Sequence, residues 1–311
     1  MSRSARAALL LLLTAMIWGA AFVAQDVAAD ALEPFTFNGL RMVLAALTLV
    51  PVIAFRHRAA CKAAAQPTAD AKAVKPTLLP NDPAQRRFLL LGGLACGVML
   101  ALGSGFQQLG INAGVQAGKA GFITALYIVL VPLTGLFFGK RPTLLVWVAV
   151  VLSAIGLYLL CMQGGFVLES GDILLLLCAL SFTGHILVVD YVGAKVDGVK
   201  LSCIQFAVTA VICLTIAAFT EHPTWAAVQT AAIPILYAGI LSGGVGYTLQ
   251  IVAQKDIDPT IASLIMCLES VFAVLFGWLL LGDSMSVREY LGCGIMMIGI
   301  VLAQVPGKAK A

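Results

Sequence analysis

Glu269 lies near the centre of an almost uninterrupted apolar run, SLIMCLESVFAVLFGWLLL, at residues 263–281. A charged side chain at the centre of a membrane helix costs on the order of 2.5–3.5 kcal/mol, so it normally faces the protein interior or a watery cavity. A carboxyl in such a place could take up and release a proton, or bind an amine. A carboxyl that only bonds to a neighbouring helix is the structural alternative.

His185 is a second ionisable side chain inside an apolar run, and Asp190 follows it in the segment HILVVD. Some membrane acyltransferases carry this H-x-x-x-x-D spacing, but their chemistry needs the pair at a surface that the substrate can reach. We expect His185 deep within a span, as a proton relay, a cavity residue or a hydrogen-bonded helix contact. Catalysis by the pair is therefore the weaker hypothesis.

Gln107 and Gln250 carry amides that could bind a polar substrate from two sides. Amides that only join helices are the alternative, and each contributes about 0.6 kcal/mol. Arg41 and Lys119 lie near the expected outer ends of their apolar runs. Both could attract anions, and Arg41 could hold a substrate carboxylate, although a long basic side chain can also extend to the membrane surface.

Three aromatic residues, Trp18, Tyr127 and Tyr247, combine a large apolar surface with one polar atom and could line a cavity for a substrate. Packing, or a place at the membrane interface, is the alternative for each of them. Pro132 predicts a local break in its helix, because proline has no backbone N–H to donate.

The elements that position these residues are membrane helices. The chain has 311 residues, of which 61% are hydrophobic and 11% charged, and its mean hydropathy is +1.01. Soluble domains are about 45–50% apolar and about 25% charged. We therefore predict an all-α integral membrane protein with about ten spans. The expected spans are residues 7–26, 35–55, 88–110, 117–138, 143–162, 171–190, 201–219, 231–252, 259–281 and 287–305.

Several classes of function are disfavoured by the same sequence. No G-x-x-x-x-G-K-[ST] loop for ATP occurs, and the connections are too short for a soluble catalytic domain. The eight cysteines form no C-x-x-C pair, so we expect neither a metal site nor a disulfide framework. No cofactor is expected, and nucleic acid is not an expected partner because no basic stripe alternates with aromatic residues.

The basic residues predict the orientation. If the N-terminus faces the cytoplasm and the spans alternate, all but three of the 19 Lys and Arg residues face inward, the exceptions being Arg41, Lys119 and Arg288. Both termini are then cytoplasmic, as is a flexible loop predicted at residues 56–87. A bacterial inner membrane is the expected location.

An internal repeat divides the chain into residues 1–162 and 163–311. A shift of 143 aligns Gly103 with Gly246, Gln107 with Gln250 and Gly156 with Gly299, and a shift of 164 aligns Asp26 with Asp190, Arg41 with Gln205 and Phe55 with Phe219. Each half holds five spans, and this odd number makes the second half enter the membrane in the opposite direction. Inverted repeats of this kind are typical of secondary transporters, which bind their substrates near the midplane.

Several stretches resemble the drug/metabolite transporter superfamily, in its EamA-type branch. They are WGAAFVAQ at 18–25, PFTFNGLR at 34–41, AGFITALYIVLVPLTGLFFGKRP at 120–142 and ASLIMCLESVFAVLFGWLLLGD at 262–283. The resemblance implies ten helices in two inverted five-helix domains around a cavity that opens alternately to each side. It also implies transport of small metabolites, often outward, including amino acids. One departure is that Glu269 precedes Ser270, where the family often has proline.

The sequence therefore favours a secondary transporter that exports a small metabolite, such as an amino acid or a related compound, in a proton-coupled or facilitative way. Its partners would be the lipid bilayer and a small-molecule substrate, with a homodimer as an open alternative. An integral-membrane transferase using His185 and Asp190, or a membrane receptor that transports nothing, are the competing hypotheses.

Overall fold

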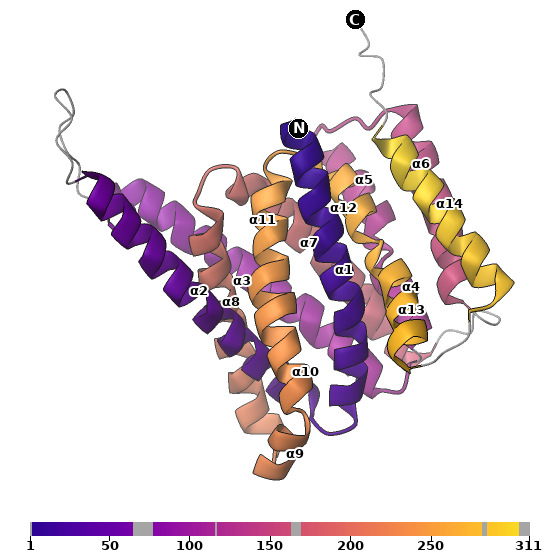
Figure 1. Ribbon diagram of the computed structural model, residues 1–311, viewed down its shortest axis with the longest axis horizontal. Helices are drawn as coiled ribbons and strands as arrows, with labels where there is room; N and C mark the ends of the chain where they lie inside the picture. The colour runs from indigo at the N-terminus through magenta and orange to yellow at the C-terminus, as the bar shows by residue number, and fades with distance from the viewer. Residues whose placement is uncertain (1, 65–76, 116, 163–168, 282–284, 305–311) are drawn as a thin grey trace, which may run out of the picture.

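The computed structural model describes residues 2–64, 77–115, 117–162, 169–281 and 285–304, and within them it contains helices and no strand (Figure 1). The first half comprises α1 (Arg3–Ala29), α2 (Pro34–Ala64), α3 (Pro83–Asn112), α4 (Ala117–Thr124), α5 (Tyr127–Phe137) and α6 (Leu144–Cys161). The second half comprises α7 (Ser170–Gly193), α8 (Gly198–Thr220), α9 (Trp225–Thr230), α10 (Ala232–Leu236), the π-helix η1 (Tyr237–Tyr247), α11 (Thr248–Gln254), α12 (Pro259–Met266), α13 (Glu269–Phe276), the π-helix η2 (Gly277–Leu281) and α14 (Val287–Ala303).

Nine segments of the described chain are long and apolar enough to cross a membrane. They include the composite spans Lys119–Phe137, Ala232–Gln254 and Pro259–Leu279, each built from more than one helical piece. The remaining expected span corresponds to α14, a helix of 17 residues. These findings confirm the all-α membrane architecture.

The connection predicted as a loop at residues 56–87 is partly helical, so the predicted loop was too long. Helix α2 continues to Ala64, because the segment AFRHRAACKAA consists largely of strong helix formers. Helix α3 already begins at Pro83, where the Asp82 side chain accepts hydrogen bonds from the backbone of Ala84 and Gln85. Residues 65–76 lie outside the described part, as do residues 163–168, next to the predicted boundary between the halves.

Helices α2 and α8, which are repeat mates, pack against each other in opposite directions. At one end, Glu221 after α8 accepts hydrogen bonds from the backbone N–H groups of Phe35 and Thr36 at the start of α2, at 2.8 and 2.6 Å. At the other end, Arg56 near the end of α2 pairs with Asp197 before α8 at 2.8 Å. Equivalent helices of the two halves are therefore antiparallel, which is the inverted arrangement predicted from the odd number of spans.

A second antiparallel pair, α6 and α14, crosses at very short range. A Cβ atom on Gly292 would lie 2.7 Å from the Gly156 carbonyl oxygen, and one on Gly299 would lie 2.6 Å from the Ser153 hydroxyl oxygen. Only glycine allows the backbones to approach this closely, because any side chain would occupy the space of the partner helix. Gly156 and Gly299 are also repeat mates at the shift of 143.

Glu221 is expected to be one of the main stabilising residues of the α2–α8 pair. Its buried carboxylate accepts three hydrogen bonds, the third from the Thr36 hydroxyl at 2.7 Å. Replacement by alanine leaves two N–H groups at the start of α2 without partners, and we expect a loss of about 1–3 kcal/mol of stability. Thermal unfolding of the purified protein measures this loss. Alanine in place of Asp82, which caps α3 from an exposed position, is the control and should cost less.

The fourth and ninth spans are broken at equivalent points. Helix α4 ends at Thr124 and α5 begins at Tyr127, while α12 ends at Met266 and α13 begins at Glu269. The intervening Leu126 and Leu268 have nearly the same backbone angles, φ −59° and ψ −11° against φ −60° and ψ −12°. Both breaks are tight turns with hydrogen bonds between residues three apart, such as Leu126 N–H to the Ile123 carbonyl.

Neither break needs a proline at the break itself. Pro132, which was expected to interrupt the fourth span, lies inside α5, six residues beyond the break. In the ninth span, Ser270 stands where the family often has proline, yet the break before Glu269 is present. The Ser270 backbone N–H donates to the Cys267 carbonyl at 3.2 Å, which closes the turn. The breaks place Tyr127 and Glu269 at the first position of a new helix.

Candidate functional site

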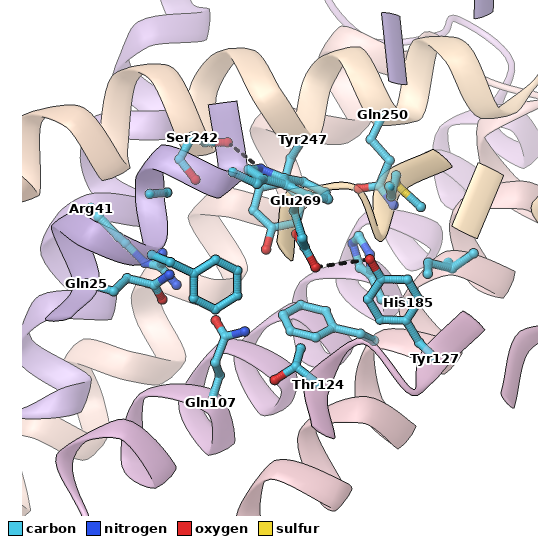
Figure 2. A pocket seen from close by; sticks show the side chains of 16 residues that line it. Gln25, Arg41, Gln107, Thr124, Tyr127, His185, Ser242, Tyr247, Gln250 and Glu269 are labelled. Atoms are coloured by element: carbon cyan, nitrogen blue, oxygen red, sulfur yellow. Dashed lines mark hydrogen bonds between the residues drawn. The ribbon is translucent and has the colours of Figure 1, made fainter. Parts of the chain in front are cut away.

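A cavity lies in the middle of the bundle, where the two halves meet (Figure 2). Its free volume is about 40 Å³, room for a few water molecules. Ten helical pieces contribute to its wall. The lining residues are Trp18, Ala21, Phe22, Gln25, Arg41, Gln107, Thr124, Tyr127, Phe182, His185, Ile186, Ser242, Tyr247, Gln250, Met266 and Glu269.

Most of this lining consists of repeat mates. The pairs are Trp18 with Phe182, Ala21 with His185, Phe22 with Ile186, Gln107 with Gln250, Thr124 with Met266, and Tyr127 with Glu269. They follow the shifts of 164 and 143, with a shift of 142 in the broken spans. Twelve of the 16 lining residues are thus related by the repeat, so the two halves contribute equivalent positions to the cavity wall. The four without a mate in the lining are Gln25, Arg41, Ser242 and Tyr247.

Glu269 faces this cavity and joins the two halves. The Tyr127 hydroxyl donates a hydrogen bond to a Glu269 carboxylate oxygen at 3.0 Å, drawn as a dashed line in Figure 2. The glutamate is only 6% exposed, and the tyrosine is equally enclosed. A carboxyl that belongs to one half and a phenol that belongs to the other can act as a contact that depends on how the halves are arranged.

His185 lies on the same side of the cavity as Tyr127, and its ring stands edge-on to the Tyr247 ring, with centroids 5.9 Å apart. Its Nε2 atom is 3.0 Å from Gln205 Oε1, so a neutral amide determines its orientation. Asp190 instead accepts a hydrogen bond from Lys140 at 2.7 Å. The structure therefore does not bring His185 and Asp190 together as an acid–base pair.

Arg41 is buried in the cavity wall and only 3% exposed. The interpretation that it extends to the membrane surface is therefore wrong, because α2 directs it toward the interior of the bundle. Its Nε–H donates to Asn38 Oδ1 at 2.8 Å, and its guanidinium carbon lies 5.3 Å from the Phe37 ring centroid. Asn38 is held in turn by a bond to the Ser104 carbonyl.

Lys119 is the one predicted site residue that the structure places outside the cavity. Its ammonium group lies 2.7 Å from a carboxylate oxygen of the fully buried Asp172 and 3.4 Å from one of Glu169. Both carboxylates belong to the start of α7, which α4 contacts. Lys119 therefore connects the two halves at this end of the bundle and is not part of the cavity wall.

The amides and aromatic rings complete the wall. Gln250 and Gln25 each have a buried side-chain oxygen without a hydrogen-bond partner, and such atoms are costly unless something else satisfies them. The Trp18 and Tyr247 rings lie 4.6 Å apart, and the Trp18 ring N–H donates to the Ser242 carbonyl at 3.2 Å. The cavity thus combines aromatic surfaces with polar groups that can accept further bonds.

Sequence reasoning missed several lining residues. Gln25 and Phe22 lie seven and four positions after Trp18, a spacing that puts all three on one face of a helix. That periodicity could have identified them once Trp18 was selected. Thr124 and Met266 line the cavity because they precede the helix breaks, and no residue type in the sequence marks those breaks.

Comparison with known proteins agrees with this architecture. The model of the EamA-like transporter family matches residues 5–162 and, separately, residues 169–304. The chain belongs to this family. One copy of the domain therefore corresponds to each half of the chain, as expected for an internal repeat.

Its relatives carry transporter names. An uncharacterized transporter of Archaeoglobus fulgidus is 26% identical over 95% of this chain and 84% of its own length. The uncharacterized transporter YwfM of Bacillus subtilis is 24% identical over 97% of this chain and 95% of its own length. The uncharacterized inner membrane transporter YedA of Escherichia coli K12 is 22% identical over 92% of this chain and 87% of its own length. A crystal structure at 16% identity superposes with a TM-score of 0.76 over 96% of both chains, which shows the same fold.

These matches make the EamA-type protein a membrane transporter by homology. They agree with the function favoured by the inverted repeat and by the cavity between the two halves. Neither the transferase nor the receptor hypothesis gains support, since His185 and Asp190 have separate partners and the named relatives are transporters.

Proposed function

We propose that this EamA-type protein is a secondary transporter that exports a small polar metabolite by alternating access, with Glu269 as the proton-coupling group. The observation that carries the proposal is the Tyr127–Glu269 bond between the two halves, in a cavity lined largely by repeat mates. A proton or a substrate amine that binds Glu269 competes with this bond between the halves. Binding at one residue is thereby linked to the relative position of the two domains.

The contacts at the two ends of the α2–α8 pair support an alternating mechanism. The Arg56–Asp197 pair is exposed, and such surface pairs contribute about 0–1 kcal/mol, so it separates easily. Glu221 and Thr36 at the opposite end are buried, and the three hydrogen bonds to the Glu221 carboxylate are harder to separate. If the basic end faces the cytoplasm, the cavity opens more readily to the cytoplasm, where an exporter loads its substrate.

The proposed function can be tested with purified protein in sealed vesicles. A pH gradient is imposed, and the movement of each of the twenty amino acids and of their amine derivatives is measured. Flux that depends on the gradient supports the proposal. Vesicles that behave like protein-free vesicles for every compound contradict it, and chemical conversion of a compound by the protein without any compartment would favour the transferase hypothesis.

The orientation that we propose, with both termini in the cytoplasm, has a native reporter. Helix α1 begins and α14 ends at the same end of the bundle in Figure 1. Cys61, in the part of α2 that extends from the bundle toward this end, is the exposed cysteine of the eight. A membrane-impermeant maleimide is expected to label Cys61 in inverted inner-membrane vesicles and to leave it unlabelled in intact spheroplasts. Cys61→Ser is the control, and labelling of Cys61 in intact spheroplasts would contradict this orientation.

A further inference from the structure

The part of the cavity that the repeat does not duplicate contains Arg41. Its repeat mate is Gln205, a neutral amide that binds His185 and lies outside the lining. The second half therefore has a hydrogen-bonded amide at this position, while the first half places a guanidinium group in the cavity wall. Packing requirements shared by the two halves do not explain this charge.

The Arg41 guanidinium has no acidic partner among the described residues. Its polar contact is the Nε–H bond to Asn38, and no carboxylate of the described chain lies within ion-pair distance. A buried charge without a counter-ion is strongly destabilising, and arginine stays protonated in proteins. The missing negative charge is most simply supplied by a ligand.

The geometry of Arg41 selects the kind of anion. The Arg41 Nε–H already donates to Asn38, so the two terminal nitrogens are left to donate to a ligand. They lie side by side at the end of the planar guanidinium group. Such a pair matches the two oxygens of a carboxylate in a bidentate arrangement. The Phe37 ring, whose centroid lies 5.3 Å from the guanidinium carbon, adds a cation–π contact.

The neighbours of Arg41 complete a polar corner. Figure 2 shows Gln25 beside Arg41 on one side of the cavity, with Gln107 below them, and Glu269 lies between this corner and Tyr127. Gln25 comes from α1 and is 4% exposed, and its side-chain oxygen has no partner. The Gln25 amide nitrogen can therefore donate a hydrogen bond to a carboxylate held by Arg41, and its oxygen can accept one from an amine next to that carboxylate.

We infer that Arg41 and Gln25 form a carboxylate-binding subsite, and that the substrate is a small zwitterion whose amino group is directed toward Glu269. This inference rests on the proposed function, since it assigns the substrate class of the same cavity. The aromatic rings of Trp18 and Phe22, which also line the cavity, provide an apolar surface for the remaining part of such a molecule.

Binding to the purified protein in detergent tests the subsite without a compartment. Each of the twenty L-amino acids is titrated by calorimetry, and each one that binds is compared with its amide and with its decarboxylated amine. We expect an amino acid to bind, and its amide and amine to bind about 100-fold more weakly. Arg41→Gln should lower the affinity for the acid to that of the amide and leave the affinity for the amide unchanged. Arg41→Lys should restore only part of the difference, because lysine has no planar pair of donors.

Several outcomes would overturn the inference. They are an amide that binds as tightly as its acid, an Arg41→Gln protein with wild-type affinity for the acid, or no binding by any amino acid. Inorganic phosphate and glycerol phosphate are tested in parallel, and preference for them over the acids would overturn the carboxylate assignment. Lys119→Gln is the matched control, because it removes a cation outside the cavity and should leave binding unchanged.

The two proposals fail in different ways. Acid binding that depends on Arg41, combined with no flux in vesicles, contradicts the proposed transport and leaves the subsite in place. Flux driven by a pH gradient that is indifferent to Arg41→Gln overturns the subsite and leaves the transport function in place.

Discussion

Replacement of Glu269 by glutamine is expected to abolish transport driven by a pH gradient while the protein remains folded. Glutamine has nearly the same shape, and its oxygen can still accept the bond that the Tyr127 hydroxyl donates to Glu269 at 3.0 Å. It cannot take up and release a proton. We expect gradient-driven accumulation in vesicles to fall by about tenfold or more, equivalent to at least about 1.4 kcal/mol of lost coupling.

Exchange of labelled for unlabelled substrate, measured without a gradient, separates coupling from binding. If Glu269 serves only coupling, Glu269→Gln should keep exchange and lose accumulation, and if it also binds the substrate amine, both should fall. Tyr127→Phe is the matched variant, because it keeps the acid and removes the hydroxyl that bonds to it across the halves. It should lower gradient-driven accumulation by weakening the link between the halves, but less than Glu269→Gln does, because the carboxyl can still take up and release a proton. Wild-type accumulation by Glu269→Gln would show that this carboxyl has only a structural role.

The largest effect on stability is expected at the crossing of α6 and α14. A Cβ atom on Gly292 would lie 2.7 Å from both the Gly156 carbonyl oxygen and the Leu160 backbone nitrogen, and neither backbone atom can move independently of its helix. Gly292→Ala is expected to destabilise the protein by about 1–3 kcal/mol, the usual cost of overpacking. Gly292→Leu should separate the helices and leave little folded protein, as measured by size-exclusion chromatography and thermal unfolding in detergent.

Gly294 provides the control on the same helix. It is exposed, and a Cβ atom there would meet nothing within 4 Å. Alanine or leucine at position 294 should leave the unfolding temperature unchanged or slightly raised, because both are better helix formers than glycine. Equal destabilisation at positions 292 and 294 would mean that the close crossing does not hold these helices together.

The residues alone were sufficient for the architecture. Long apolar segments must form helices in a membrane, because every buried backbone N–H and C=O group has to be satisfied within its own segment. The positions of Gly103, Gln107 and Arg41 relative to their repeat mates then indicated two related halves, and the odd number of spans in each half indicated that they run in opposite directions. The sequence also identified Glu269 and seven further residues that line one cavity, since polar and ionisable groups are unusual at such depth and aromatic rings with a polar atom suit a cavity wall.

The three-dimensional arrangement decided how those residues are paired. The helix breaks before Tyr127 and Glu269 have no proline at the break, and a turn with nearly the same backbone angles forms each of them. Arg41 and Lys119 looked alike in the sequence, yet one faces the cavity and the other pairs with Asp172. The reason is physical. Residue type and spacing determine which face of a helix a side chain occupies, whereas the partner of that face depends on contacts between segments more than a hundred residues apart.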